Sequence, residues 1–305
     1  MKISYIQKDN LQSTETRISY NLIQKFNERG IDVTVNAWDE DCKIILSVNG
    51  LGTYDIYEDI INKIKETDKS RDANLSLFNN IKTIMYVWDM YPWNGYIKGY
   101  ESLKEYNEIW VPSNEVILRL NEFYDIDPSK CKVIKAYAEL FESDNIEVKN
   151  NNFAYHFARD YIDPNVGFCE KASIITGIPL VKSSHNLSFE EYKKRVLTCS
   201  FLVLDYMEAS TGGLTMMEGY YHGKNILLSD SLYQGGRDYW GDRAYYFRDG
   251  DFTDYLNKFT MLYEQSLNYK LTDEALNERK KYVRDNFTID VMVDNIISRL
   301  NELNG

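Results

Sequence analysis

The sequence predicts an α/β protein with two doubly wound domains, each built on a parallel sheet. In both halves of the chain, short apolar strand patterns alternate with amphipathic helix patterns, which is typical of parallel sheets covered by helices. The chain has 305 residues and a hydrophobic share of 44%, which is enough for two packed cores. Residues 142–152 are polar and show no periodicity, so we interpret them as the linker between the domains.

The first half opens with a strand, a helix and a second strand. Residues 2–7 and 31–35 are apolar strand patterns, and Gly30 ends the helix pattern between them. The apolar residues of this helix recur at helical spacing: Ile18, Leu22, Ile23 and Phe26. Further strands are predicted over 43–48, 82–88 and 108–111, with helices over 57–66 and 115–123.

The second half repeats the alternation. Strands are predicted over 153–158, 179–182, 201–204 and 225–228, with helices over 166–176, 188–197 and 214–222. We therefore expect domains at 1–147 and 148–286, with residues 287–305 forming a terminal amphipathic helix that packs back across the cleft. The cleft between two such domains is the usual place for a ligand.

Composition narrows the class of protein. The net charge of −12 argues against a general nucleic-acid or anionic-membrane surface, although it is compatible with a local basic groove.

The apolar runs are too short to span a bilayer, and the chain starts directly in a strand pattern, so we expect a cytoplasmic protein with no membrane span. The four cysteines form no CxxC pair, which predicts reduced core thiols. The 25 Tyr, 13 Phe and 5 Trp suit stacking against sugars or bases, or reflect a compositional habit.

The most informative segment is residues 201–223. A buried strand ends, a turn of small residues follows, and a helix begins near Leu214. Such a turn presents unpaired backbone N–H groups and the positive end of the helix dipole, which together suit a diphosphate. Gly212 and Gly213 leave room for close approach, and Ser210, Thr211 and Thr215 belong to the same turn.

Glu218 lies one turn into this helix. A carboxylate beside a phosphate pocket is suited to accept hydrogen bonds from two ribose hydroxyls. The alternative interpretation is a plain helix cap with a solvated glutamate.

Residues 202–229 resemble the signature of the retaining GT-B glycosyltransferases of family GT4, where a strand and a glycine turn precede a helix that carries Glu. Gly213 and Leu214 fall on the family's glycine turn, Glu218 on its ribose-binding Glu, and residues 223–227 on its closing segment. The resemblance implies the GT-B fold, two Rossmann-like domains with parallel sheets facing a cleft. Residues 1–147 would then lie on the acceptor side, and residues 148–286 would bind the donor nucleotide.

Weaker matches and two departures accompany this signature. Residues 108–114, 127–134 and 249–251 resemble other family segments in the right order, and Ala158-Arg159 resembles the family's Gly-Arg, whose Arg reaches the donor phosphates. The family's first Glu is replaced by Ser210, with Glu208 close by. The Lys that usually follows the phosphate Arg is missing, and the candidates to replace it are Arg237, Arg243 and Lys171.

The acceptor side has its own candidates. Asp89 follows an apolar strand and is expected at the carboxyl edge of the first sheet, where it would orient the acceptor hydroxyl or act as its base. Tyr91 and Trp93 would stack on acceptor rings, and Ser13 or Thr14 would lie near the donor phosphates or the acceptor. The alternatives are a capped turn with packed aromatics and a simple helix cap.

No metal site is predicted. The acidic pairs Asp39/Asp41, Asp125/Asp127 and Asp249/Asp251 imitate a DxD motif, but none ends an apolar strand convincingly. The three histidines lack metal-ligand spacing, and His156 lies inside a predicted strand. The absence of GxGxxG and GxxxxGK weakens a dinucleotide-dependent dehydrogenase and removes a P-loop kinase.

The resemblance implies transfer of a hexosyl group from a nucleotide-diphosphate sugar to a hydroxyl, with retention and without a required cofactor or metal. The acceptor would be a glycan, a small molecule or a modified nucleic-acid base, the last disfavoured by the charge of −12. Two other classes stay open: a GT-B-fold sugar-nucleotide 2-epimerase, and a non-catalytic, glycosyltransferase-like binding subunit.

Overall fold

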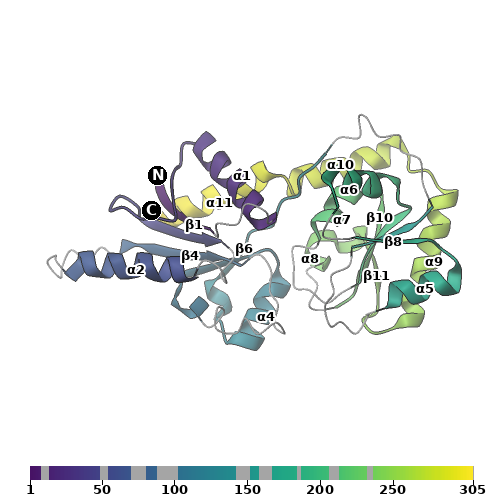
Figure 1. Cartoon of the computed structure of the whole chain (residues 1–305), viewed down its shortest axis with the longest axis horizontal. Helices are drawn as coiled ribbons and strands as arrows, with labels where there is room; N and C mark the ends of the chain where they lie inside the picture. The colour runs from purple at the N-terminus through teal and green to yellow at the C-terminus, as the bar shows by residue number, and fades with distance from the viewer. Residues whose placement is uncertain are drawn as a thin grey trace. The chain divides into compact units, whose positions relative to one another are not determined.

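The computed structural model describes residues 1–7, 14–48, 54–69, 80–87, 102–141, 152–157, 167–183, 187–205, 213–231 and 236–304. The chain divides into two compact units (Figure 1). The first unit combines residues 1–135 with 289–305, and the second comprises residues 136–288.

The first unit is built on a parallel six-stranded sheet of order β2-β1-β3-β4-β5-β6. Its strands are β1 (Lys2–Ile6), β2 (Asp32–Val35), β3 (Ile44–Val48), β4 (Lys82–Tyr86), β5 (Glu108–Val111) and β6 (Cys131–Val133). Its helices include α1 (Thr14–Glu28), α2 (Tyr54–Lys69) and α4 (Asn114–Tyr124), with short 3₁₀ turns η3 (Ser102–Glu105) and η4 (Pro128–Lys130). Every residue of β3 and β5 is buried, as expected for strands covered by helices on both faces.

The last helix, α11 (Ile289–Asn304), belongs to this first unit and packs against α1 (Figure 1). Its buried stripe follows the spacing of a helix face: Met292, Val293, Ile296 and Leu300. Arg29 at the end of α1 donates hydrogen bonds to Asp290 at 3.0 Å and to Asp294 at 2.7 Å. The chain thus returns to its first unit after completing the second.

The second unit is built on a parallel five-stranded sheet of order β11-β10-β9-β7-β8. Its strands are β7 (Ala154–His156), β8 (Leu180–Lys182), β9 (Phe201–Leu204), β10 (Asn225–Ser229) and β11 (Tyr245–Phe247). Its helices are α5 (Phe168–Thr176), α6 (Phe189–Thr198), α7 (Leu214–Tyr221), α8 (Gly236–Trp240), α9 (Phe252–Asn268) and α10 (Asp273–Asn286), with the 3₁₀ turn η5 (Gly241–Arg243).

The alternation of side chains along β9 divides the second unit into two cores. Leu202 and Leu204 pack with α7 and α10, whereas Phe201 and Val203 pack with α5 and α9. The predicted α/β class with parallel sheets is therefore confirmed in both units. The apolar pattern of the sequence does not predict β11, which is only three residues long.

The strand order fixes where ligands bind in such a sheet. From β7 the chain passes to β8 on one side, and it then crosses back to place β9 on the other side of β7. The crevice between the carboxyl ends of β7 and β9 is the topological switch point, where doubly wound sheets bind their ligands. Among the described residues, no helix has the length and apolar character that crossing a membrane requires.

Candidate functional site

The helix α7 starts directly beyond the carboxyl edge of the second sheet. Gly213, its N-cap, has a φ of +81°, in the region that only glycine adopts without strain. A Cβ at this position would meet Met216 Cγ at 2.8 Å and Leu204 Cδ2 at 3.0 Å. Glycine is therefore required here for both conformation and space. The preceding residues of the predicted turn, Ser210, Thr211 and Gly212, lie outside the described residues.

Glu218 is buried in α7, with 6% of its surface exposed. Its carboxylate accepts a hydrogen bond from the hydroxyl of Tyr192 on α6, and Thr215 Oγ1 lies 3.0 Å from the same hydroxyl. Burial and the neighbouring Glu218 carboxylate raise the pKa of Tyr192 well above its ordinary value, so the phenol stays a proton donor at neutral pH. The alternative of a solvated Glu218 is wrong, because the side chain is held inside the unit.

Sequence reasoning does not identify Tyr192. It occupies the middle of a helix pattern, 26 residues before Glu218, and nothing in its local sequence distinguishes it from the other tyrosines. The contact arises because α6 and α7 pack side by side on one face of the sheet.

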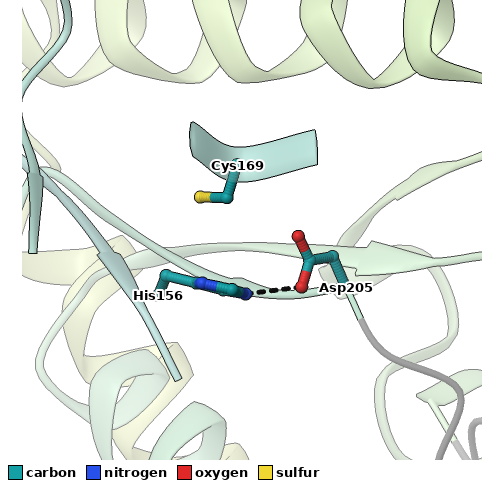
Figure 2. Close-up of side chains that lie close together, drawn as sticks. All are labelled: His156, Cys169 and Asp205. Atoms are coloured by element: carbon teal, nitrogen blue, oxygen red, sulfur yellow. Dashed lines mark hydrogen bonds and ion pairs between the residues drawn. The ribbon is translucent and has the colours of Figure 1, made fainter. Parts of the chain in front are cut away.

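A second polar cluster lies at the switch point itself. His156, the last residue of β7, places Nε2 2.5 Å from Oδ1 of Asp205, the residue directly after β9. The Cys169 thiol of α5 lies over this pair (Figure 2), and one ligand atom from each of the three residues lies within 4.8 Å of the other two. All three residues are buried.

The surroundings of this cluster are apolar. The face of the sheet that carries it is covered by aromatic and aliphatic side chains, among them Phe201, Val203 and Phe247. The Tyr255 ring on α9 packs in the same core, and its centroid lies 4.8 Å from the centroid of the Phe247 ring. Burial raises the pKa of Cys169 and of Tyr255 well above their ordinary values, with Asp205 adding to both effects. His156, Cys169 and Asp205 form the one group of three potential metal ligands found among the described residues.

The candidate replacements for the missing phosphate Lys take different positions. Arg237 pairs with Asp230, directly after β10, at 2.8 Å, and its guanidinium stacks on Tyr246. It therefore lies at the carboxyl edge of the sheet. Lys171 stacks on Phe252 and Arg243 on Tyr282.

The remaining predicted residues are not described. Arg159, Asp89, Tyr91, Trp93 and Ser13 lie outside the described residues, and Thr14 is described only as the first residue of α1. The described part of the candidate site is therefore the start of α7, with Leu214, Thr215 and Glu218, together with the switch-point cluster.

Solved structures that are similar to this chain include glycosyltransferases. The chain is similar to a glycosyltransferase from Rickettsia africae, with 14% identity, a TM-score of 0.68, and coverage of 99% of this chain and 98% of that one. It is also similar to HepE of Anabaena in complex with UDP and glucose, with 10% identity, a TM-score of 0.65, and coverage of 99% and 100%.

A third similar structure is an alpha-glucosyltransferase in complex with UDP and a DNA containing an HMU base, with 11% identity, a TM-score of 0.60, and coverage of 98% of both chains. No protein-family model and no curated protein sequence matches this chain. The similarity covers nearly the whole chain and defines its architecture: the protein has the GT-B fold of two Rossmann-like units, as predicted.

Proposed function

We propose that the protein is a glycosyltransferase that moves a hexosyl group from a nucleotide-diphosphate sugar to a hydroxyl acceptor, as a GT4-like enzyme. The observation that carries this proposal is the position of Glu218. Its carboxylate is buried one turn into a helix that starts at the carboxyl edge of a doubly wound sheet. That edge is where such sheets bind nucleotides. The GT-B fold of the chain supports the same class of reaction.

The donor nucleotide would be held at two places, its diphosphate and its ribose. The turn Ser210 to Thr215, including Gly212, Gly213 and Leu214, would place backbone N–H groups on the diphosphate, and Arg159 would add a charge. Glu218 would accept the two ribose hydroxyls, with Tyr192 fixing the orientation of its carboxylate. As the sugar leaves, negative charge grows on the diphosphate, and donors already aimed at it stabilise the transition state.

The acceptor would be bound by the first unit. Asp89 would orient or deprotonate the acceptor hydroxyl, and Tyr91, Trp93, Ser13 and Thr14 would line its site. Retention of the anomeric configuration and independence from a metal ion at the diphosphate follow from the GT4 resemblance and are part of the proposal. The protein would work in the cytoplasm, and the charge of −12 favours a glycan or small molecule over nucleic acid as acceptor.

The proposal is tested first by donor binding. Thermal-shift and calorimetric titrations with UDP-, GDP-, ADP- and TDP-sugars should identify one preferred nucleotide. Glu218→Ala and Arg159→Ala should each weaken that binding by about tenfold or more, which corresponds to about 1.4 kcal/mol. The matched control is Glu278→Ala on α10, which should bind the donor as the wild type does. Unchanged affinity in both site variants would overturn the donor assignment.

Product analysis then separates the classes of function. Glycosides formed from the preferred donor, without added Mg²⁺ or Mn²⁺, would support transfer. Epimerised sugar nucleotide formed without any acceptor would replace the proposal with a 2-epimerase. Donor binding with no turnover across glycans, small molecules and hydroxymethylated DNA would replace it with a non-catalytic binding subunit.

A further inference from the structure

From the geometry of the switch-point cluster, we infer that His156, Cys169 and Asp205 form a binding site for a zinc ion that fastens α5 to the strands β7 and β9. This inference goes beyond the proposed glycosyl transfer and does not depend on it. The ion would act on the fold of the second unit and would take no part in binding the donor diphosphate.

The three side chains offer the set of donor atoms that zinc prefers. An imidazole nitrogen, a thiolate sulfur and a carboxylate oxygen are the protein ligands found in zinc sites. Mg²⁺ and Ca²⁺ require sites made of oxygen ligands, and a single cysteine does not hold an iron–sulfur cluster. Zn²⁺ with one thiolate, one carboxylate and a neutral imidazole is also electrically neutral, which lowers the cost of burying the ion.

The spacing allows an ion after a small adjustment. One ligand atom from each residue lies within 4.8 Å of the other two. His156 Nε2 and Asp205 Oδ1 are 2.5 Å apart. Zinc–nitrogen and zinc–oxygen bonds of about 2.1 Å in a tetrahedral site place two ligands about 3.4 Å apart. The pair would therefore separate by roughly 0.9 Å to admit the ion. Without zinc, the same two groups close the site with their hydrogen bond.

The cluster is incompletely satisfied by the residues around it. His156 Nδ1 is buried and has no hydrogen-bond partner in the described ranges of the chain. Zinc bound at Nε2 would not satisfy this atom. In metal sites the second imidazole nitrogen ordinarily donates to a carboxylate, a backbone carbonyl or a water, so an ordered water would complete the site at Nδ1. Tyr255 of α9 packs in the same core, and its hydroxyl is buried as well.

The location gives such an ion a structural consequence. His156 ends β7, Asp205 follows β9, and Cys169 lies in α5, so the three ligands come from separate elements that meet at the switch point (Figure 2). An ion held by all three would cross-link these elements. Because zinc binds the thiolate and displaces the thiol proton, zinc affinity should increase with pH.

The first test is made on the wild-type protein without any donor. Elemental analysis of protein purified from zinc-supplemented cultures should find about one zinc per chain. After removal of zinc with a chelator, added Co²⁺ should produce the visible bands of tetrahedral cobalt and the near-ultraviolet band of a cobalt–thiolate bond. Protein that contains no stoichiometric zinc and shows neither band would overturn the inference and leave the cluster as a hydrogen-bond network.

Variants assign the ligands. Cys169→Ser should lose the cobalt–thiolate band and the increase in Tm on adding zinc, whereas His156→Gln and Asp205→Asn should lower the affinity for Co²⁺ by about tenfold or more. The matched control is Cys199→Ser, which removes another fully buried free thiol from the same unit and should keep both signals. A thiolate band that persists in Cys169→Ser and disappears in Cys199→Ser would also overturn the assignment. Since none of these readouts uses a sugar donor, their failure is distinguishable from failure of the proposed function.

Discussion

The Tyr192 hydroxyl on α6 donates a hydrogen bond to the Glu218 carboxylate on α7 and so joins the two helices near the predicted donor site. The bond gives the buried carboxylate a partner and a fixed direction. A glutamate that must accept two ribose hydroxyls benefits from such a fixed position, because orienting it on binding would cost conformational entropy.

Removal of this hydroxyl should affect both stability and donor binding. Tyr192→Phe removes one hydrogen-bond donor from the buried Glu218 carboxylate, so we expect a loss of about 1–3 kcal/mol in the free energy of unfolding. Donor affinity should fall as well, because the carboxylate is no longer held. Urea unfolding and calorimetric titration measure the two effects. Tyr263→Phe on α9 is the matched control and should change neither by much.

Gly213 should tolerate no side chain. Gly213→Ala combines a left-handed φ of +81° with a contact of 2.8 Å to Met216, and we expect it to cost about 2–4 kcal/mol. Gly177→Ala has a similar φ of +70° but open space around it, so it should cost only about 1 kcal/mol. Equal losses in the two variants, measured by denaturant unfolding, would mean that neither the close contact at Gly213 nor its ψ of 105°, which lies outside the αL region of Gly177, adds a cost.

The pairing of Arg299 with Glu108 should stabilise the return of α11 to the first unit. Arg299 Nε lies 2.8 Å from Oε1 of the buried Glu108, and Nη2 lies 3.1 Å from Oε2. Arg299→Ala leaves that carboxylate without its cation, so we expect a loss of about 2–3 kcal/mol, below the value for a fully buried pair because Arg299 is partly exposed. Arg248→Ala, whose partners are more exposed to solvent, should cost less than about 0.5 kcal/mol.

Acid should weaken the contact between α11 and α1. Hydrogen bonds from Arg29 and Lys25 hold the pKa of Asp290 below its ordinary value. A carboxyl group whose pKa is lower in the folded state stabilises the protein above its unfolded pKa of about 4 and loses this contribution as the pH falls through the folded value. Because the Asp290 side chain is 50% exposed, we expect the stability lost in this way to be less than about 0.5 kcal/mol.

This acid effect can be separated from those of other carboxyl groups. Unfolding free energies at about pH 6 and about pH 3 should differ less in Asp290→Asn than in the wild type, because the amide does not titrate in this range. An identical difference in the two proteins would show that Asp290 contributes nothing to the acid sensitivity.

Local sequence predicts elements of both units because their signals are local. Gly177 and Gly30 end helices through their own backbone conformation, and β9 is a continuous apolar run that ends at Asp205. Gly213 and Glu218 are recognisable for the same reason, since a glycine turn and a carboxylate one helical turn later are near neighbours in sequence. The three-residue strand β11 is not recognised, whereas β8, an edge strand of the same length, is predicted within 179–182, so length alone does not decide which short strands the sequence reveals.

The amino-acid sequence by itself determined the alternation of strands and helices, the two parallel sheets and the glycine at the start of α7, because periodicity and backbone preference act over a few residues. Only the tertiary structure brought Tyr192 to Glu218 and gathered His156, Cys169 and Asp205 at one point. Those contacts join residues up to 49 positions apart, and they depend on which strand lies beside β7 and which helix covers each face of the sheet. Packing of whole elements decides such partners, so no spacing along the chain could have indicated them.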